Sequence, residues 1–231
     1  MKSGFCQNID SDGITNIIIN NINDILNKMD NNDVYELYES SAKNIVFTLN
    51  KYPKYVCKMR VDKRNIVKNT YKSIEYIRDV IINNNLNLLK VPDLVLLDFS
   101  LGGKVHYVIV EEKMNVHPNH NMFELEYKIY GNRINNAIKQ LTILTCITGY
   151  DDAAWRNNPI LHANIDTQED LLMALIDIED VKLKNVRKGL GRIISCINEN
   201  QISLVLTMVS SYYNNINLDE FIQKRISKLK E

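Results

Sequence analysis

Hydrophobic residues follow two different spacings along the chain. Three long stretches repeat an apolar residue every three or four positions, which predicts amphipathic helices at residues 14–28, 64–84 and 130–148. Short apolar runs between polar turns are typical of strands. They occur at residues 34–37, 45–49, 55–61, 159–161 and 172–176, and also at 94–99 and 105–110 around a Gly-Gly turn. Residues from 182 onward predict two or three further helices.

The order of these elements predicts an α+β fold. Strands and one long helix fill the first half of the chain, a hairpin follows, and the second half is mostly helical. A chain of 231 residues buries roughly 70% of its unfolded surface. We therefore expect a hydrophobic core that needs neither a disulfide nor a structural metal.

Composition narrows the class of protein. Lys and Arg together number 28, as do Asp and Glu, so the formal net charge is zero. A protein that binds nucleic acid without reading its sequence is usually basic, so we expect no nucleic-acid partner. The cysteines are scattered without a CxxC pair, which is typical of reduced thiols in a cytoplasm. No apolar run is long enough for a membrane span, and the first residues lack the apolar core of a signal peptide.

Candidate chemistry is concentrated between residues 149 and 180. Asp152 is followed five positions later by Asn157, and an apolar strand-like run ends at Asp177. Phosphoryl transfer from a nucleotide with Mg²⁺ needs this set of groups. One carboxylate orients the accepting hydroxyl, while an amide and a second carboxylate hold the metal on the phosphates.

The first half of the chain offers a cation for the same chemistry. Lys58 lies in the middle of the strand-like run 55–61, and the helix that follows contains Glu75. A lysine on a strand is often an edge charge that points to water, and a helical glutamate is often simply solvated. The alternative is a lysine that contacts nucleotide phosphates and is oriented by the glutamate.

At these positions the chain resembles the protein-kinase-like superfamily. The run 56–59 (VCKM) resembles the strand that carries the phosphate-binding lysine, and Glu75 resembles its partner on the next helix. The hairpin and the residues after it, 91–116, resemble the strands that run into the hinge between the lobes. The resemblance implies that Val110 is the gatekeeper and that the backbone of Glu111, Glu112 and Lys113 meets adenine.

The resemblance continues in the second half. The run 151–157 (DDAAWRN) resembles the catalytic loop, which implies that Asp152 orients the acceptor and that Asn157 binds Mg²⁺. The run 175–179 (LIDIE) resembles the strand that ends in the second metal ligand, here Asp177. The order of lysine, glutamate, hinge, aspartate, asparagine and aspartate is kept over residues 34–181.

Three departures from the family pattern change what is expected. No glycine-rich loop is present, so small residues such as Ser40 and Ser41 would have to bring backbone N–H groups to the phosphates. Tyr150 and Asp151 replace the usual His-Arg pair, so we expect no switch by phosphorylation of an activation loop. Asp177 is followed by Ile and Glu instead of Phe and Gly.

The resemblance implies a two-lobed protein-kinase-like fold with a strand-rich N-lobe and a reduced helical C-lobe. Residues 1–30 would form an N-terminal helical extension, 31–114 the N-lobe and hinge, and 115–231 the reduced C-lobe. The implied activity is transfer of the γ-phosphoryl group of ATP, with Mg²⁺, to a hydroxyl of a protein (Ser or Thr) or of a small molecule. The short C-terminal part resembles the minimal kinase-fold effectors that intracellular bacteria secrete. The expected location is therefore a cytoplasm, either that of the source cell or that of a host whose proteins would be acceptors.

Two other functions stay open at the level of sequence. A catalytically weak pseudokinase or interaction module fits the missing glycine-rich loop and the altered residues after Asp177. A Mg²⁺-dependent nuclease of the PD-(D/E)xK type fits Asp93, Glu111 and Lys113, with Gln140 on the next long helix as a helper. The two alternatives differ in what they require of Asp93, which has no role in the kinase hypothesis.

Overall fold

The computed structural model of the chain describes residues 9–38, 44–60, 64–117, 127–153, 156–163, 165–167, 169–179 and 181–212. The chain divides into two compact units. Unit 1 contains residues 1–72 and 92–114, and unit 2 contains residues 73–91 and 115–231. The fold is mixed, with a five-stranded sheet in unit 1 and mainly helices in unit 2, as the sequence predicts.

Unit 1 is built on an antiparallel sheet in the order β1-β2-β3-β6-β5. The strands are β1 (Tyr35–Leu37), β2 (Asn44–Leu49), β3 (Tyr55–Arg60), β5 (Leu94–Leu101) and β6 (Lys104–Glu112). All five were predicted from the apolar runs. The β5–β6 hairpin turns at Gly102 and Gly103, whose φ angles of 56° and 74° favour glycine at both positions.

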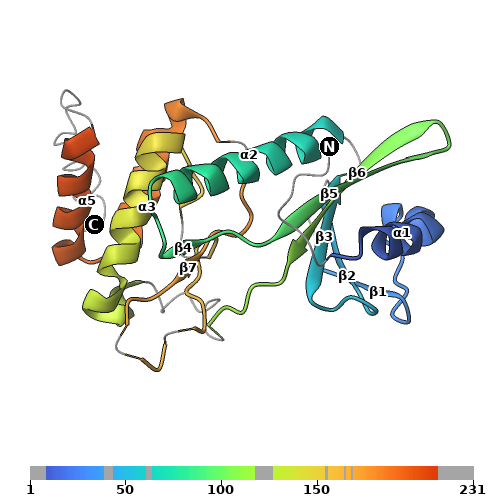
Figure 1. The fold of residues 1–231 in the computed structure, drawn as a ribbon, viewed down its shortest axis with the longest axis horizontal. Coiled ribbons are helices and arrows are strands. Elements are labelled where there is room, and N and C mark those ends of the chain that lie inside the picture. Colours follow the sequence, from blue (N-terminus) through green and yellow to red (C-terminus); the bar gives the residue numbers. More distant parts are fainter. Residues whose placement is uncertain are drawn as a thin grey trace. The chain divides into compact units, whose positions relative to one another are not determined.

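One face of this sheet is covered by helix α1 (Ser11–Leu26), which lies beside the strands in Figure 1. Asp10 caps the helix, because its carboxylate accepts a hydrogen bond from the N–H of Gly13 at 2.9 Å. Every third or fourth residue of α1 is buried, as its periodicity predicts. The isoleucines of this stripe share one hydrophobic cluster with residues at alternate positions of the sheet. The helix contributes Ile14, Ile18, Ile22 and Ile25, and the sheet contributes Ile45, Phe47, Cys57, Met59, Val108 and Val110.

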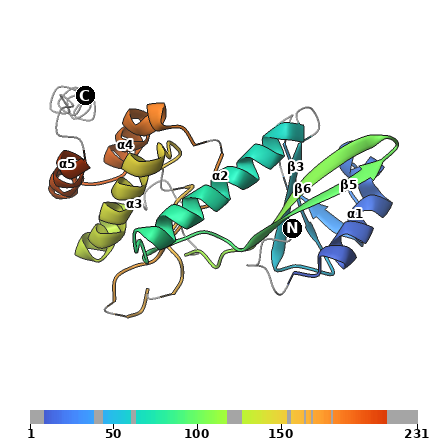
Figure 2. The same cartoon turned by 45° about the horizontal axis from the view of Figure 1, so that its top comes forward.

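Helix α2 (Arg64–Asn83) begins in unit 1 and ends in unit 2. The other elements of unit 2 are short strands and helices. They are β4 (Leu89–Lys90), η1 (Tyr127–Ile134), α3 (Asn135–Thr148), β7 (Met173–Ala174), η2 (Leu183–Asn185), α4 (Val186–Ser195) and α5 (Glu199–Tyr212). Helices α4 and α5 both pack against α3, and the three lie together in Figure 2.

The helix predicted for residues 130–148 is shorter in the structure. Residues 127–134 form 3-10 turns, and α3 starts only at Asn135. The cause is Gly131, whose φ of 56° and ψ of −135° are not helical. At its other end α3 stops at Gly149, which has a φ of 72° and donates its N–H to the carbonyl of Thr145. Within the part of the chain that the structure describes, no helix is long and apolar enough to cross a membrane.

Candidate active site

The pleat of β3 places Lys58 on the face of the sheet that α1 does not cover. Lys58 lies opposite Ile109 of β6, whereas Cys57 lies opposite Val110. Because side chains alternate across a strand, Lys58 and Ile109 share one face, and Cys57 and Val110 share the other. Cys57 and Val110 are buried in the cluster that α1 completes. Lys58 therefore stands on a regular strand with its side chain directed away from this core.

Glu111 is an ionic partner of Lys58 in unit 1. The ammonium of Lys58 and Oε1 of Glu111 are 2.6 Å apart. The Glu111 side chain is only 9% exposed, whereas that of Lys58 is 27% exposed. Glu111 comes two residues after Ile109 on β6, so the pleat returns it to the face of Lys58. A partly buried charge-assisted contact of this kind fixes the direction of a flexible lysine.

The remaining hinge residues of the sequence analysis are spread over both faces of the sheet. The side chain of Val110 is fully buried in the α1 cluster, so Ile109 and Glu111, not Val110, take the positions beside Lys58. Glu112 is exposed. Lys113 donates to the hydroxyl of Tyr38 at 3.1 Å and lies over its ring. Ser40 and Ser41 lie outside the described residues, in the connection from β1 to β2.

Helix α2 carries the other carboxylate that the sequence assigns to Lys58. In the part of α2 that belongs to unit 1, the ammonium of Lys68 lies 5.9 Å from the ring centre of Tyr107. Tyr107 alternates with Val108 on β6 and so shares the face of Ile109. Glu75 lies seven residues after Lys68, which places both on the same side of the helix. Glu75 is half-buried and belongs to unit 2.

The strand register separates the three residues of the nuclease hypothesis. Leu94 of β5 lies opposite Glu111, and the N–H of Glu112 donates to the carbonyl of Asp93 at 2.7 Å. Asp93 is thus paired with Glu112, and the pleat directs Asp93 away from the face of Glu111. The burial agrees, since Asp93 and Glu112 are exposed while Leu94 and Glu111 are buried. This register disfavours a metal site that requires Asp93 and Glu111 to converge.

In unit 2, an antiparallel ribbon brings Asn157 and Asp177 to the same end. Backbone hydrogen bonds run from Leu161 to Leu172, from Ala174 to Pro159 and from Ile176 to Asn157, at 2.8–2.9 Å. The last of these bonds joins the carbonyl of Asn157 to the residue before Asp177. Of the predicted strands at 159–161 and 172–176, only β7 is a regular strand, but the ribbon they predict is present.

Asp177 has an unusual backbone conformation. Its φ is 57°, in the left-handed region that few residues other than glycine adopt. Lys28 and Asn85 also have positive φ, but each follows the C-terminal end of a helix, where such angles are common. Asp177 follows the ribbon, and its side chain is exposed. Residues held in this region without a helix end to account for them are concentrated at functional sites.

The backbone of Asp152 is held by its neighbours in the same loop. The hydroxyl of Tyr150 donates to the carbonyl oxygen of Asp152 at 3.1 Å and accepts from the side-chain amide of Asn158 at 2.9 Å. The amide of Asn157 also donates to this carbonyl, at 3.5 Å. Tyr150 is buried, and burial raises the pKa of its hydroxyl, so it stays a neutral donor.

Two cations of α4 contact the consecutive acidic residues of this loop. Arg192 forms an ion pair with Asp152, and Lys188 forms one with Asp151 at 2.5 Å. Neither contact was predicted from the sequence. The only signal was that the segment 181–195 contains five Lys and Arg residues and no acidic residue. That pattern predicts a basic surface but does not say which carboxylates it meets.

The oxygen atoms of Asn157 and Asp177 suit a magnesium ion. Mg²⁺ prefers carboxylate and amide oxygens and usually keeps ligands from the phosphates of a nucleotide. The Asn157 amide nitrogen is turned to the carbonyl of Asp152, which leaves its Oδ1 on the other side of the amide. No group of three His, Cys, Asp or Glu side chains that could hold a metal occurs among the residues described. A site completed by phosphate oxygens does not need such a group.

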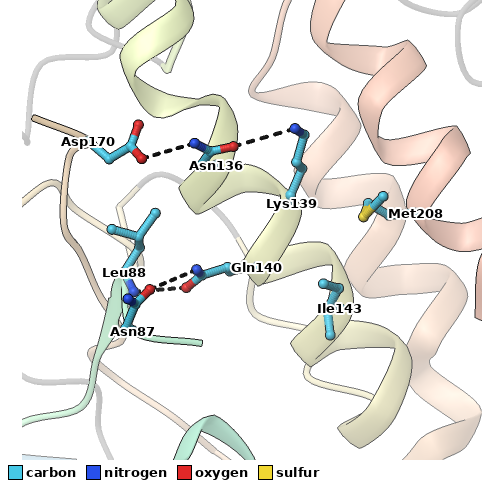
Figure 3. A pocket seen from close by; sticks show the side chains of 8 residues that line it. All are labelled: Asn87, Leu88, Asn136, Lys139, Gln140, Ile143, Asp170 and Met208. Atoms are coloured by element: carbon cyan, nitrogen blue, oxygen red, sulfur yellow. Dashed lines mark hydrogen bonds between the residues drawn. The ribbon is translucent and has the colours of Figure 1, made fainter. Parts of the chain in front are cut away.

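A pocket of about 350 Å³ lies elsewhere in unit 2, between α3, α5 and the start of β4 (Figure 3). Gln140 uses both ends of its amide there, because Oε1 accepts from the N–H of Leu88 and Nε2 donates to Asn87. On the other side Asp170 accepts from Asn136, which in turn accepts from Lys139. These polar groups bind one another, so Gln140 fastens β4 to α3 and is not directed at a substrate.

Comparison with known proteins identifies the fold. No family model and no curated protein matches the sequence. The GDP and kanamycin complex of APH(2″)-IIIa has a TM-score of 0.54 and 11% identity, over 92% of this chain and 86% of that chain. The GDP complex of a wild-type aminoglycoside 2′-phosphotransferase-IIIa has a TM-score of 0.50 and 12% identity, over 94% and 87%. The chain therefore has the protein-kinase-like fold that the sequence predicts.

Proposed function

We propose that this protein is a phosphotransferase that moves the γ-phosphoryl group of ATP to a hydroxyl group. The observation that carries the proposal is the ribbon of unit 2, which brings Asn157 and Asp177 to the same end. Asp152 lies five residues before Asn157 in the same loop. Lys58 on its strand, with Glu111 beside it, supplies the cation. The fold, shared with two aminoglycoside phosphotransferases solved with GDP, supports the same chemistry.

In the proposed reaction the acceptor oxygen forms a bond to the γ-phosphorus, and the bond from the γ-phosphorus to the bridging oxygen of ADP breaks. Asp152 accepts a hydrogen bond from the acceptor hydroxyl and takes its proton as the new bond forms. Lys58 binds the α- and β-phosphates, and Glu75 is the carboxylate of α2 assigned to orient it. Asn157 and Asp177 would hold Mg²⁺, whose charge neutralises the β- and γ-phosphates. The proposal requires both sets of residues to act on one nucleotide.

The acceptor we favour is a small molecule. Both structural neighbours are named as aminoglycoside phosphotransferases, and one contains kanamycin. A Ser or Thr hydroxyl of a protein is the second possibility, because the same carboxylate can orient either hydroxyl. The bound GDP of both neighbours makes GTP a donor to be tested beside ATP.

The test is transfer from γ-labelled ATP or GTP, with Mg²⁺, by the purified full-length protein. Acceptors are a panel of polyols and amino sugars and, separately, a protein lysate. We expect labelled product from the wild type and from Asp93→Ala, and at least about 100-fold less from Asp177→Ala. Nucleotide binding without transfer to any acceptor would favour the pseudokinase instead. Mg²⁺-dependent nicking of a plasmid that is lost in Asp93→Ala would replace the proposal by the nuclease.

A further inference from the structure

The loop that contains Asp152 is held from two directions. Tyr150 and Asn157 bind the carbonyl oxygen of Asp152 and so fix its main chain. Arg192 binds its carboxylate, through Nη1 and Oδ1. A main chain fixed in this way still allows the carboxylate to rotate about the side-chain bonds. Among the residues that the structure describes, the contact with Arg192 is thus the one that sets the direction of the carboxylate.

Helix α4 is placed to make this contact. Lys188 and Arg192 are one helical turn apart and therefore project from the same side of α4. They meet Asp151 and Asp152 in the same order along the chain. Gly189 lies between the two cations, and a Cβ atom there would overlap the carbonyl oxygen of Tyr150. The absence of a side chain at Gly189 lets α4 approach the loop closely enough for Arg192 to reach Asp152.

Arginine suits this task better than lysine does. Its planar guanidinium keeps its charge at any physiological pH and presents donors in fixed directions. Because Arg192 uses Oδ1, the second oxygen of Asp152 can accept the hydrogen bond from a substrate hydroxyl.

We infer that Arg192 is a positioning residue that orients the Asp152 carboxylate toward the phosphoryl acceptor. The inference rests on the proposed function, because it gives Asp152 the same role. It goes beyond the family resemblance, which supplies no cation from the helix after Asp177. The neighbouring pair of Lys188 and Asp151 has the same origin on α4 but a more exposed cation, with 58% of the Lys188 side chain accessible against 32% for Arg192.

This neighbouring pair provides a matched control. Arg192→Gln and Lys188→Gln each remove one α4 cation and one ion pair, but only the first frees the Asp152 carboxylate. We expect Arg192→Gln to lower kcat by about 100-fold, the typical cost of misplacing a catalytic group, with little change in KM for the nucleotide. Lys188→Gln should stay within about 2-fold of the wild type, as expected for an exposed pair. Arg192→Lys should recover part of the lost kcat, because it restores the positive charge but not the planar guanidinium with its donors in fixed directions.

Three further measurements separate positioning from a loss of structure. The urea midpoints of Arg192→Gln and Lys188→Gln should agree, and hydrogen exchange should show the α4 amides equally protected in both. In an Asp152→Ala background, Arg192→Gln should change the residual rate by less than about 2-fold, because residues that act as a unit are not additive.

The outcomes distinguish a failure of the proposed function from a failure of the role assigned to Arg192. No transfer by the wild type overturns the proposed function and this inference with it. Transfer that depends on Asp177 but is equally strong in Arg192→Gln and Lys188→Gln overturns the inference alone. If Arg192→Gln does not fold, Arg192→Lys becomes the test, and a wild-type kcat in Arg192→Lys overturns the inference. If Arg192→Gln folds, a loss of rate that is additive with Asp152→Ala also overturns the inference.

Discussion

The two halves of the set of candidate residues, one in each unit, are built in different ways. Lys58 and Glu111 stand on neighbouring strands of unit 1, and the pleat alone decides which face each side chain takes. Asp152, Asn157 and Asp177 of unit 2 lie on segments with little regular structure. Their geometry comes from single backbone bonds, from the buried Tyr150 and from α4.

This difference determines which substitutions should disturb the candidate residues of each unit. A residue on a strand keeps its face as long as the register holds, so a substitution there acts mainly through the group it removes. A residue on a loop depends on every contact that holds the loop, so a change in a distant glycine can displace it. Activity should therefore be sensitive in unit 2 to changes at positions that carry no chemistry, and in unit 1 mainly to changes at Lys58 and Glu111.

The largest effect is expected at Asp177. Asp177→Ala should lower transfer by at least about 100-fold, which corresponds to about 2.7 kcal/mol of barrier, because it removes the carboxylate assigned to the metal. Glu179→Ala is the matched control, since Glu179 is an equally exposed carboxylate two residues later. Initial rates with labelled nucleotide decide the comparison. Similar rates for the two variants would remove Asp177 from the site.

The next effect tests whether the loop half depends on close packing. Gly149 and Gly103 have nearly the same φ, 72° and 74°. A Cβ at Gly149 would overlap the carbonyl of Lys182, whereas nothing lies within 4 Å of one at Gly103. Gly103→Ala should cost only the left-handed strain of about 1–2 kcal/mol. Gly149→Ala should cost about 1–3 kcal/mol more, because a backbone atom must move.

Urea unfolding of the two glycine variants measures this difference directly. The transfer rate of Gly149→Ala, under conditions where it is folded, should fall as well, because Tyr150 and the loop follow Gly149 in the chain. Equal midpoints for Gly149→Ala and Gly103→Ala would contradict the view that the chain before η2 and α4 is pressed against this loop.

A smaller effect tests the strand half. Glu111→Gln keeps the shape of the side chain but removes the charge that pairs with Lys58, and should cost about 1–2 kcal/mol of stability. Glu112→Gln changes the adjacent exposed residue and should cost less than about 0.5 kcal/mol. Thermal or urea unfolding checks both values. A larger loss in Glu112→Gln would mean that the register of β3 and β6 is wrong.

The sequence predicted the regular parts of the molecule well, for a physical reason. Short apolar runs between polar turns identified the strands of unit 1, and a stripe of isoleucines identified α1. Within the strands, the gatekeeper role of Val110 stays a prediction, and the structure adds that Val110 is paired with Cys57 and so lies on the face opposite Lys58. The information was present in the sequence, but the register between β3 and β6 was needed to use it.

The contacts of the loop half could not be predicted in the same way. Arg192 is 40 residues from Asp152 in the chain, and no periodicity links an arginine on a helix to a carboxylate on a loop. The contacts of Tyr150 depend on the burial of its side chain and on the close approach of Gly189 to its carbonyl, neither of which the sequence alone reveals. The break at Gly131 was hidden because the apolar pattern runs on both sides of it. For Arg192 and Tyr150 tertiary packing decides the outcome, whereas at Gly131 the backbone conformation of one glycine does.

The last effect concerns two buried thiols with raised pKa values, Cys57 of unit 1 and Cys146 of unit 2. Burial raises the pKa of Cys57 to about 12, with a further contribution from the charge of Glu111, and burial alone raises that of Cys146 to about 12. The ordinary value is 9.0. Below pH 9 both thiols are protonated in the folded and unfolded chains, and their contribution to stability is fully present. As the pH rises from 9 toward 12, only the unfolded chain loses these protons, so stability falls.

Unfolding midpoints measured between pH 8 and pH 11 should therefore decline more steeply in the wild type than in Cys57→Ala or Cys146→Ala. Glu111→Gln sharpens the comparison of the two units, because it removes a charge that acts on Cys57 and is not among the causes of the shift at Cys146. In Glu111→Gln, the alkaline decline that is attributable to Cys57 should shrink, while that of Cys146 should stay the same. An equal change at both thiols would show that Glu111 acts on overall stability and not through the electrostatics of its own sheet.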